Sequence, residues 1–126
     1  MLSIILVLAC SFQVSASERS SGALGTCYIT VSGTTSGIRV TFETNATASA
    51  DKIGCKDIVL QEKVNGVWKA INIAEGYATG TSTYSGSAVY TSAVAGRTYR
   101  AYCTHYATWG STTKTLSNSS GELVYN

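Results

Sequence analysis

Proline is absent from this chain of 126 residues, and histidine occurs only once. Secreted β-proteins often use proline to protect sheet edges and to shape turns, so the 12 glycines must supply most of the turn geometry here. No stretch of ten residues has a convincing helical period, which argues against a helical domain. There is also no run of basic residues, and the net charge is only +2. Nucleic acid is therefore not an expected partner.

The usual sequence marks of an enzyme are missing too. We find no G-x-S-x-G nucleophile motif and no glycine-rich phosphate loop, and the acidic residues are scattered singly rather than in pairs suited to acid–base chemistry. Cys103 and His105 could form a nucleophile and base, but residues two apart on a strand have Cβ atoms about 6 to 7 Å apart, beyond direct hydrogen bonding. We therefore predict no enzyme activity and no catalytic residues.

Residues 1–16 are predicted to be a secretory signal peptide. Their uncharged apolar run, MLSIILVLACSF, is too short to span a bilayer comfortably, and the small residues of Val14–Ala16 suit cleavage after Ala16. No Lys or Arg precedes the run, which departs from the usual pattern. Two alternatives stay open: a buried N-terminal strand, or a lipobox-like segment, Val7–Cys10, through which a lipid on Cys10 anchors the protein at the cell surface.

The remainder is predicted to form a flexible leader, residues 17–25, and one domain, residues 26–126. Apolar and polar side chains alternate in several short segments separated by turn signals, and Asn65-Gly66 is a strong hairpin signal. This pattern favours an all-β fold: a two-sheet antiparallel β-sandwich of about seven strands. We expect longer connections at 45–54, with one helical turn near 50–53, and at 75–83. Strands are expected at 27–32, 38–44, 57–64, 67–71, 84–94, 98–108 and, interrupted, 112–125.

The longest alternating segment lies at residues 96–110. We expect Tyr99 to be buried at its start, with its hydroxyl bonded to the preceding connection, and His105 to face inward. Tyr102 and Tyr106 have the opposite parity and should stand on the outer face, while Trp109 should lie on the surface where the strand ends. Exposed rings can bind sugars by stacking, so we take Tyr102, Tyr106 and Trp109 as candidate binding residues. The alternative is that these rings only stabilise the sheet through cross-strand pairs.

The segment that begins at Tyr99, YRAYCT, resembles the tyrosine-corner strand of fibronectin-III-like and immunoglobulin-like domains. Over roughly residues 26 to 126 the chain also resembles a group of small secreted proteins from Gram-positive, often gut-dwelling, bacteria. The matching text is IGCKDIVLQEKVNGVW, GRTYRAYCTHYA and LSNSSGELVY. The resemblance implies secretion and a β-sandwich, and it implies no particular activity.

Three cysteines remain once Cys10 is removed with the signal peptide. In the expected topology the strands of Cys55 and Cys103 are antiparallel neighbours, so we favour a Cys55–Cys103 disulfide, with Cys27 left as a reactive thiol or as a bridge between two copies. A Cys27–Cys103 pair and three buried thiols are the alternatives. No Cys-x-x-Cys pair is present, so we predict no metal and no cofactor.

These observations predict a secreted, non-catalytic β-sandwich that acts outside the cell. Its partner is expected to be an extracellular protein or surface, with a glycan as the alternative, and no stable membrane span is expected.

Overall fold

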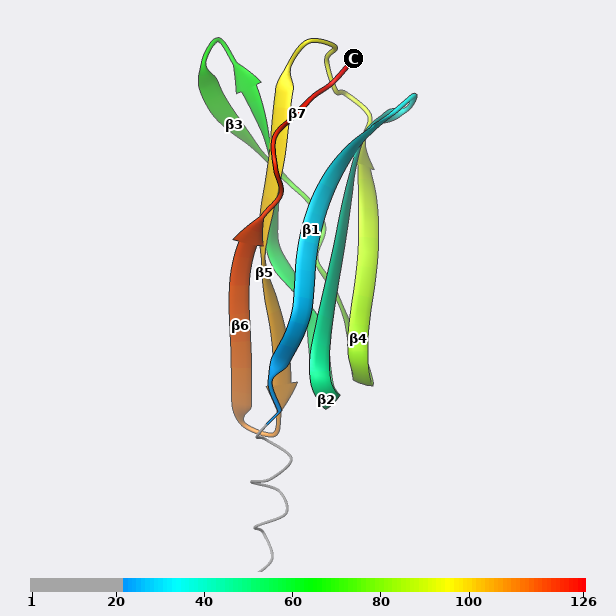
Figure 1. Cartoon of the computed structure of the whole chain (residues 1–126), viewed down its shortest axis with the longest axis vertical. Coiled ribbons are helices and arrows are strands. Elements are labelled where there is room, and N and C mark those ends of the chain that lie inside the picture. Colours follow the sequence, from blue (N-terminus) through cyan, green and yellow to red (C-terminus); the bar gives the residue numbers. More distant parts are fainter. Residues whose placement is uncertain (1–21) are drawn as a thin grey trace, which may run out of the picture.

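The computed structural model describes residues 22–126, and within them seven β-strands account for the fold (Figure 1). The all-β class and the antiparallel pairing expected from the sequence are confirmed. Within this range no helix is long and apolar enough to cross a membrane. The strands are β1 (Leu24–Thr34), β2 (Gly37–Val64), β3 (Val67–Asn72), β4 (Gly76–Tyr90), β5 (Thr98–Trp109), β6 (Thr112–Ser119) and β7 (Leu123–Val124).

Strand β2 organises the sheet, because its 28 residues pair with four other strands. The first part lies between β1 and β4, where Val40 is opposite both Val31 and Ala88. The later part pairs with β5 and then with β3, where Leu60 is opposite Ala101 and Ile71. The main path through the sheet is therefore β1-β2-β5-β6, with β3 and β4 also on β2 and with β7 on β5.

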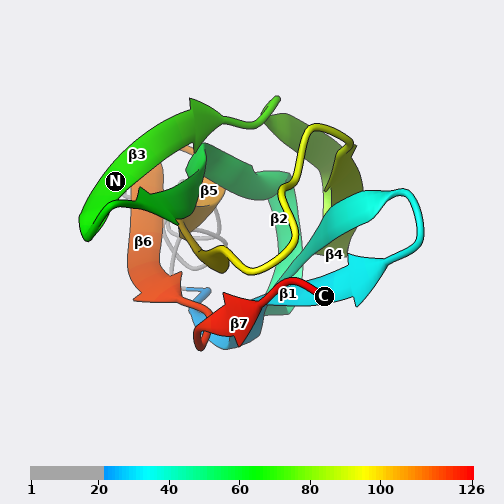
Figure 2. The ribbon, with the colours of Figure 1, turned by 90° about the horizontal axis from the view of Figure 1, so that it is seen from above.

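The sheet curls until its two ends meet. Asn118 on β6 donates a hydrogen bond from Nδ2 to the carbonyl of Cys27 on β1 at 3.0 Å. Seen from above, the strands surround a central region (Figure 2). The described strands are hydrogen-bonded into one curled sheet, so the expected division into two sheets is not confirmed. Its continuity comes from β2, which runs from one part of the sheet into the other without a loop.

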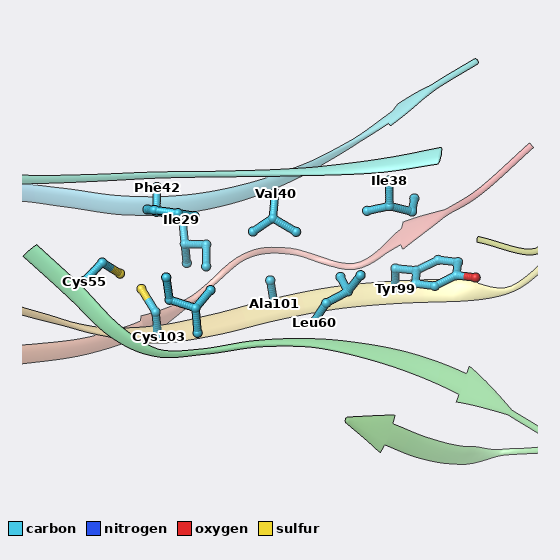
Figure 3. Packing of buried hydrophobic residues seen from close by; sticks show 10 residues of the cluster. Ile29, Ile38, Val40, Phe42, Cys55, Leu60, Tyr99, Ala101 and Cys103 are labelled. Carbon is cyan, nitrogen blue, oxygen red and sulfur yellow. The ribbon is translucent and has the colours of Figure 1, made fainter. Parts of the chain in front are cut away.

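The core lies inside this curl and follows the period-two pattern of the sequence. Every second residue of β5 from Tyr99 to Trp109 is buried, and Ile38, Val40 and Phe42 face them from β2 (Figure 3). A second, smaller cluster contains Ala50, Ile53, Ala107 and Trp109.

The prediction of a connection at 45–54 is wrong, because β2 continues through these residues. The pairing of β2 with β4 shifts register between Asn45 and Ala50. Such an irregularity takes up extra residues and bends a strand while it stays paired. Ala50 and Ile53 are buried in the second core cluster, so burial of these side chains favours a bent strand over the helical turn we expected.

The prediction of a loop at 75–83 is also wrong. Strand β4 begins at Gly76, and its first residues pair with β2, with Thr79 opposite Lys52 and Tyr77 opposite Gly54. β-Branched and aromatic residues such as Thr and Tyr favour extended backbone once a partner strand is available. The same strand ends at Tyr90, four residues before the end that the sequence indicated.

The hairpin at Asn65-Gly66 is confirmed. Both residues have positive φ, 52° and 80°, and Val64 pairs directly with Val67 across the turn.

The predicted signal peptide, Cys10 and residues 17–21 lie outside the described residues. The last part of the expected leader belongs to the fold, because β1 begins at Leu24 and Ala23 accepts a hydrogen bond from Thr47 N at 2.8 Å.

Candidate functional site

Two groups of side chains stand out: a buried cluster around His105, and an aromatic and cationic face on the outside of the sheet. The buried cluster follows from strand register. Cys55 on β2 is directly opposite His105 on β5, and Cys103 on β5 is directly opposite Asn118 on β6. Thr44, on the earlier part of β2, reaches the same point across the core, where its Oγ1 lies 2.7 Å from His105 Nδ1. Cys55, Cys103, His105 and Thr44 are at most 1% exposed.

The hydrogen bonds of His105 identify where its protons lie. Asn118 uses Nδ2 to donate to the Cys27 carbonyl, so its Oδ1 faces His105 Nε2 at 2.8 Å, and Nε2 carries a proton. Thr44 Oγ1 donates to the Gly54 carbonyl at 3.0 Å and therefore accepts from Nδ1. The ring is then an imidazolium, beside Cys103 Sγ at 3.4 Å.

The titration of the cluster agrees with this arrangement. Contact with the Cys55 thiol, followed by the hydrogen bond from His105, holds the pKa of Cys103 at about 6 although burial opposes it. The contact with Cys103 and burial both raise the pKa of Cys55. Burial alone lowers the pKa of His105, but the hydrogen bond and charge of Cys103 outweigh it, so that the pKa is raised. The lowered pKa of Cys103 and the raised pKa of His105 both favour a thiolate beside a protonated ring.

The expectation that Cys103 and His105 are too far apart for a direct hydrogen bond is wrong. Both side chains point inward from β5, and although their Cβ atoms start far apart, the side chains lean together until Sγ and Nε2 are 3.4 Å apart. The pair is nevertheless enclosed, since Cys103 is 1% and His105 0% exposed.

The favoured Cys55–Cys103 disulfide is not formed in the structure, where Cys27, Cys55 and Cys103 are all free. The two strands are neighbours as expected, and Figure 3 shows the two sulfur atoms facing each other. Register explains the difference. Cys55 is opposite His105, which makes Cys103 a diagonal neighbour, and diagonal Cα atoms are about 7–8 Å apart, whereas a disulfide needs less than about 7 Å.

Cys27 stands apart from this pair on β1. It is partly exposed, and its Sγ lies 3.6 Å from the carbonyl of Gly25 and 3.7 Å from that of Asn45. Its expected role in a dimer stays a prediction.

The second group lies on the outer face of β2, β3, β4 and β5. Tyr102, as expected, is exposed at 39% of its surface, and Tyr106 has the same parity and is half-buried. Rings and cations alternate over this face, which we call the aromatic–cation face. It consists of Lys52, Lys56, Lys63, Trp68, Tyr77, Arg100, Tyr102 and Tyr106.

A cleft lies within the aromatic–cation face. Gly54 on β2 is opposite Tyr77 on β4 and Tyr106 on β5, so two rings flank a position that has no side chain. The cleft has a volume of about 450 Å³ and is also lined by Lys52, Glu75 and Gly76.

Ion–ring contacts hold the cations of this face in place. Lys52 Nζ lies 4.3 Å from the centre of the Tyr77 ring, and Lys56 Nζ lies 5.6 Å from that of Tyr106. On β3 the Trp68 ring is contacted by Lys63 Nζ at 5.4 Å and by the Arg100 guanidinium at 3.9 Å. The face therefore presents flat rings and positive charge together.

The surface position expected for Trp109 is wrong. Trp109 is 2% exposed, packs in the second core cluster, and donates from Nε1 to the Ser49 carbonyl at 3.1 Å. Its parity is that of Tyr99, Cys103 and His105, so the alternation that placed those residues inside applied to Trp109 as well. Tyr77, which is 58% exposed, was missed because its segment was expected to be a loop.

No protein-family model matches the chain, and no curated protein or solved structure matches it either.

Proposed function

We propose that this protein is a secreted, non-catalytic interaction module and that the aromatic–cation face binds its extracellular partner. The observation that carries the proposal is the pairing of rings on the outer face with cations on neighbouring strands, above all the exposed Tyr77 with Lys52 and the half-buried Tyr106 with Lys56. Tyr and Trp contribute large contact areas with a polar atom at the rim, and Tyr, Trp and Arg are enriched at interfaces.

The charge of the face indicates the chemistry of the partner. Four cations lie against its rings, namely Lys52, Lys56, Lys63 and Arg100. The carboxylate of Glu75 is held by the backbone, since its Oε2 accepts from Asp57 N at 2.8 Å. A protein surface with exposed acidic side chains and apolar edges complements this arrangement.

A glycan is the second candidate, and the cleft favours it. Tyr77 and Tyr106 stand on either side of Gly54, with Lys52 and Glu75 at the rim. Flat apolar ring surfaces with a few polar groups beside them suit a sugar ring, whose faces carry C–H groups and whose edges carry hydroxyls.

Secretion rests on the sequence of residues 1–16, with lipid attachment at Cys10 as the alternative, and on the resemblance to secreted proteins of Gram-positive bacteria. The fold we propose is a sandwich related to fibronectin-III domains. Two features support this relation: β2 joins a β1-β2-β4 group to a β3-β2-β5-β6 group, and Tyr99 donates and accepts hydrogen bonds at a tyrosine corner.

Binding is tested by probing labelled protein against an array of neutral and acidic glycans and against purified extracellular-matrix and mucosal glycoproteins. Tyr77→Ser and Tyr106→Ser remove the two rings of the cleft. Tyr28→Ser is the matched control, because Tyr28 is an exposed tyrosine on β1 whose hydroxyl bonds Glu43.

We expect binding that falls at least tenfold in the two cleft variants, survives in Tyr28→Ser and weakens as salt rises. Loss of binding after deglycosylation of the ligand selects the glycan candidate. Equal binding by all variants, or no binding to any ligand class, rejects the aromatic–cation face as the binding surface.

A further inference from the structure

The buried cluster contains three ligands, two thiols and one imidazole, of kinds that metal ions favour. Cys55 Sγ, Cys103 Sγ and a ring nitrogen of His105 all lie within 4.8 Å of one another, and all three residues are buried. In a tetrahedral zinc site, with Zn–S near 2.3 Å and Zn–N near 2.0–2.1 Å, neighbouring S and N ligands are roughly 3.5 Å apart. The observed separation of Cys103 Sγ and His105 Nε2 is 3.4 Å. This separation matches a zinc site, and the other two ligand separations, which lie within 4.8 Å, can reach it by small side-chain shifts.

The surroundings provide the remaining parts of such a site. Asn118 Oδ1 lies 2.8 Å from Nε2 and takes the hydrogen-bonding position of that nitrogen, so its side chain must turn aside before it can serve as a fourth donor. On the other side of the ring, Nδ1 faces Thr44 Oγ1 at 2.7 Å, and the Thr44 hydroxyl donates its own hydrogen bond to the Gly54 carbonyl. Histidines that bind metal through one nitrogen usually donate the other N–H to such an oxygen, which fixes the ring and its tautomer.

Charge selects the ion. Two thiolates, one neutral imidazole and a divalent cation sum to zero, which is the arrangement a closed apolar core tolerates best. A monovalent ion leaves one negative charge buried. Without metal, Nε2 lies within hydrogen-bond distance of Asn118 Oδ1 and Cys103 Sγ, and a divalent ion takes the place of the shared proton once the Asn118 side chain turns aside.

We infer that Cys55, Cys103 and His105 bind a structural zinc ion, with Asn118 Oδ1 as the fourth donor and Thr44 as the residue that positions the ring. The site is closed, as structural zinc sites are, so the ion enters as the chain folds. It links β2, β5 and β6 at the point where the sheet closes on β1. This inference is independent of the proposed function, because the cluster lies inside the core and the aromatic–cation face lies outside.

The test uses the protein refolded with its thiols reduced and with zinc chloride present, then freed of loose metal by gel filtration. Elemental analysis gives the zinc content. Cys55→Ser, Cys103→Ser and His105→Gln each remove one ligand. Cys27→Ser is the matched control, since Cys27 is the remaining described thiol and lies outside the cluster. Refolding with cobalt chloride adds a readout on the unmodified chain, because bound thiolates give a charge-transfer absorption.

We expect about one zinc ion per chain, kept in Cys27→Ser and reduced at least tenfold in each ligand variant. Thr44→Val should weaken zinc affinity by roughly 10- to 100-fold, and Thr44→Ser should restore it. The inference is overturned if the reduced wild-type chain retains no zinc, if its cobalt form lacks the thiolate absorption, or if Cys27→Ser loses as much zinc as Cys103→Ser.

Discussion

The hydroxyl of Tyr99 donates a hydrogen bond of 2.6 Å to Oε2 of Glu62, and the two residues are directly opposite each other on β5 and β2. The same hydroxyl accepts from the backbone N–H of Val94 at 2.8 Å. Glu62 is 7% exposed, and its other oxygen lies 3.4 Å from Arg97. One buried ring therefore joins the core, a buried carboxylate and the connection between β4 and β5.

Removing only the hydroxyl should be costly. Tyr99→Phe leaves the Glu62 carboxylate and the Val94 N–H without this partner, so we expect a loss of about 1–3 kcal/mol in the free energy of unfolding. Tyr99→Ala also removes the ring and should cost about 3–5 kcal/mol. Urea denaturation measures both. Tyr28→Phe, an exposed tyrosine that also bonds a carboxylate, should leave stability unchanged, and a cost for Tyr99→Phe no larger than that of Tyr28→Phe contradicts the buried network.

The same residue should make stability depend on alkaline pH. Burial, followed by the hydrogen bond to Glu62, raises the pKa of Tyr99 to about 12. A raised pKa in the folded state means that the stabilisation is complete below the unfolded value, near 10, and is lost as pH rises through 12. Unfolding free energies measured from pH 9 to 12 should fall more steeply in wild type than in Tyr99→Phe. If the unfolding free energies of wild type and Tyr99→Phe fall equally with pH, ionisation of Tyr99 is not the cause of the alkaline loss of stability.

Trp109 should behave as a core residue. Its indole is 2% exposed and bonds the Ser49 carbonyl, so Trp109→Ala should cost about 3–5 kcal/mol. Gly22→Ala should destabilise in the same region, because a Cβ at Gly22 meets the Trp109 ring. Chemical denaturation decides the point. If Trp109→Ala is as stable as wild type, the indole is not a core residue, and the surface position expected from the sequence is correct.

Gly54 should not tolerate a side chain. A Cβ there lies 2.8 Å from Tyr77 Cβ and still closer to the Gly76 carbonyl, so Gly54→Ala should lose about 1–3 kcal/mol through overpacking and distort the cleft. Gly121→Ala is the matched control, because nothing lies within 4 Å of its Cβ and its φ is not positive. Both variants are melted thermally. Equal melting temperatures for Gly54→Ala and Gly121→Ala contradict the close approach of β2 and β4 at Gly54.

The secreted product should begin at Ser17. Intact-mass measurement of the protein from culture supernatant reports the cleavage site directly. Detection of a lipid-modified species that begins at Cys10 would instead show that the protein is anchored at the cell surface. A non-reducing gel of the same sample shows whether Cys27 links two copies.

Several features follow from the sequence alone. Alternation of apolar and polar residues placed Tyr99 and His105 inside and Tyr102 outside, because side chains on a strand point to opposite faces in turn. The positive φ demanded by a two-residue turn located the Asn65-Gly66 hairpin. Both are local properties of the backbone.

The rest depended on contacts between distant segments. Whether residues 45–54 and 75–83 form loops or strands was decided by their pairing with each other, which local propensity cannot show. The cleft exists because register sets Tyr77 and Tyr106 on either side of Gly54. The cluster around His105 exists because the curl brings Thr44 and Asn118 to one ring. Strand order and register are set by the packing of the whole sheet, so only the tertiary structure could decide them.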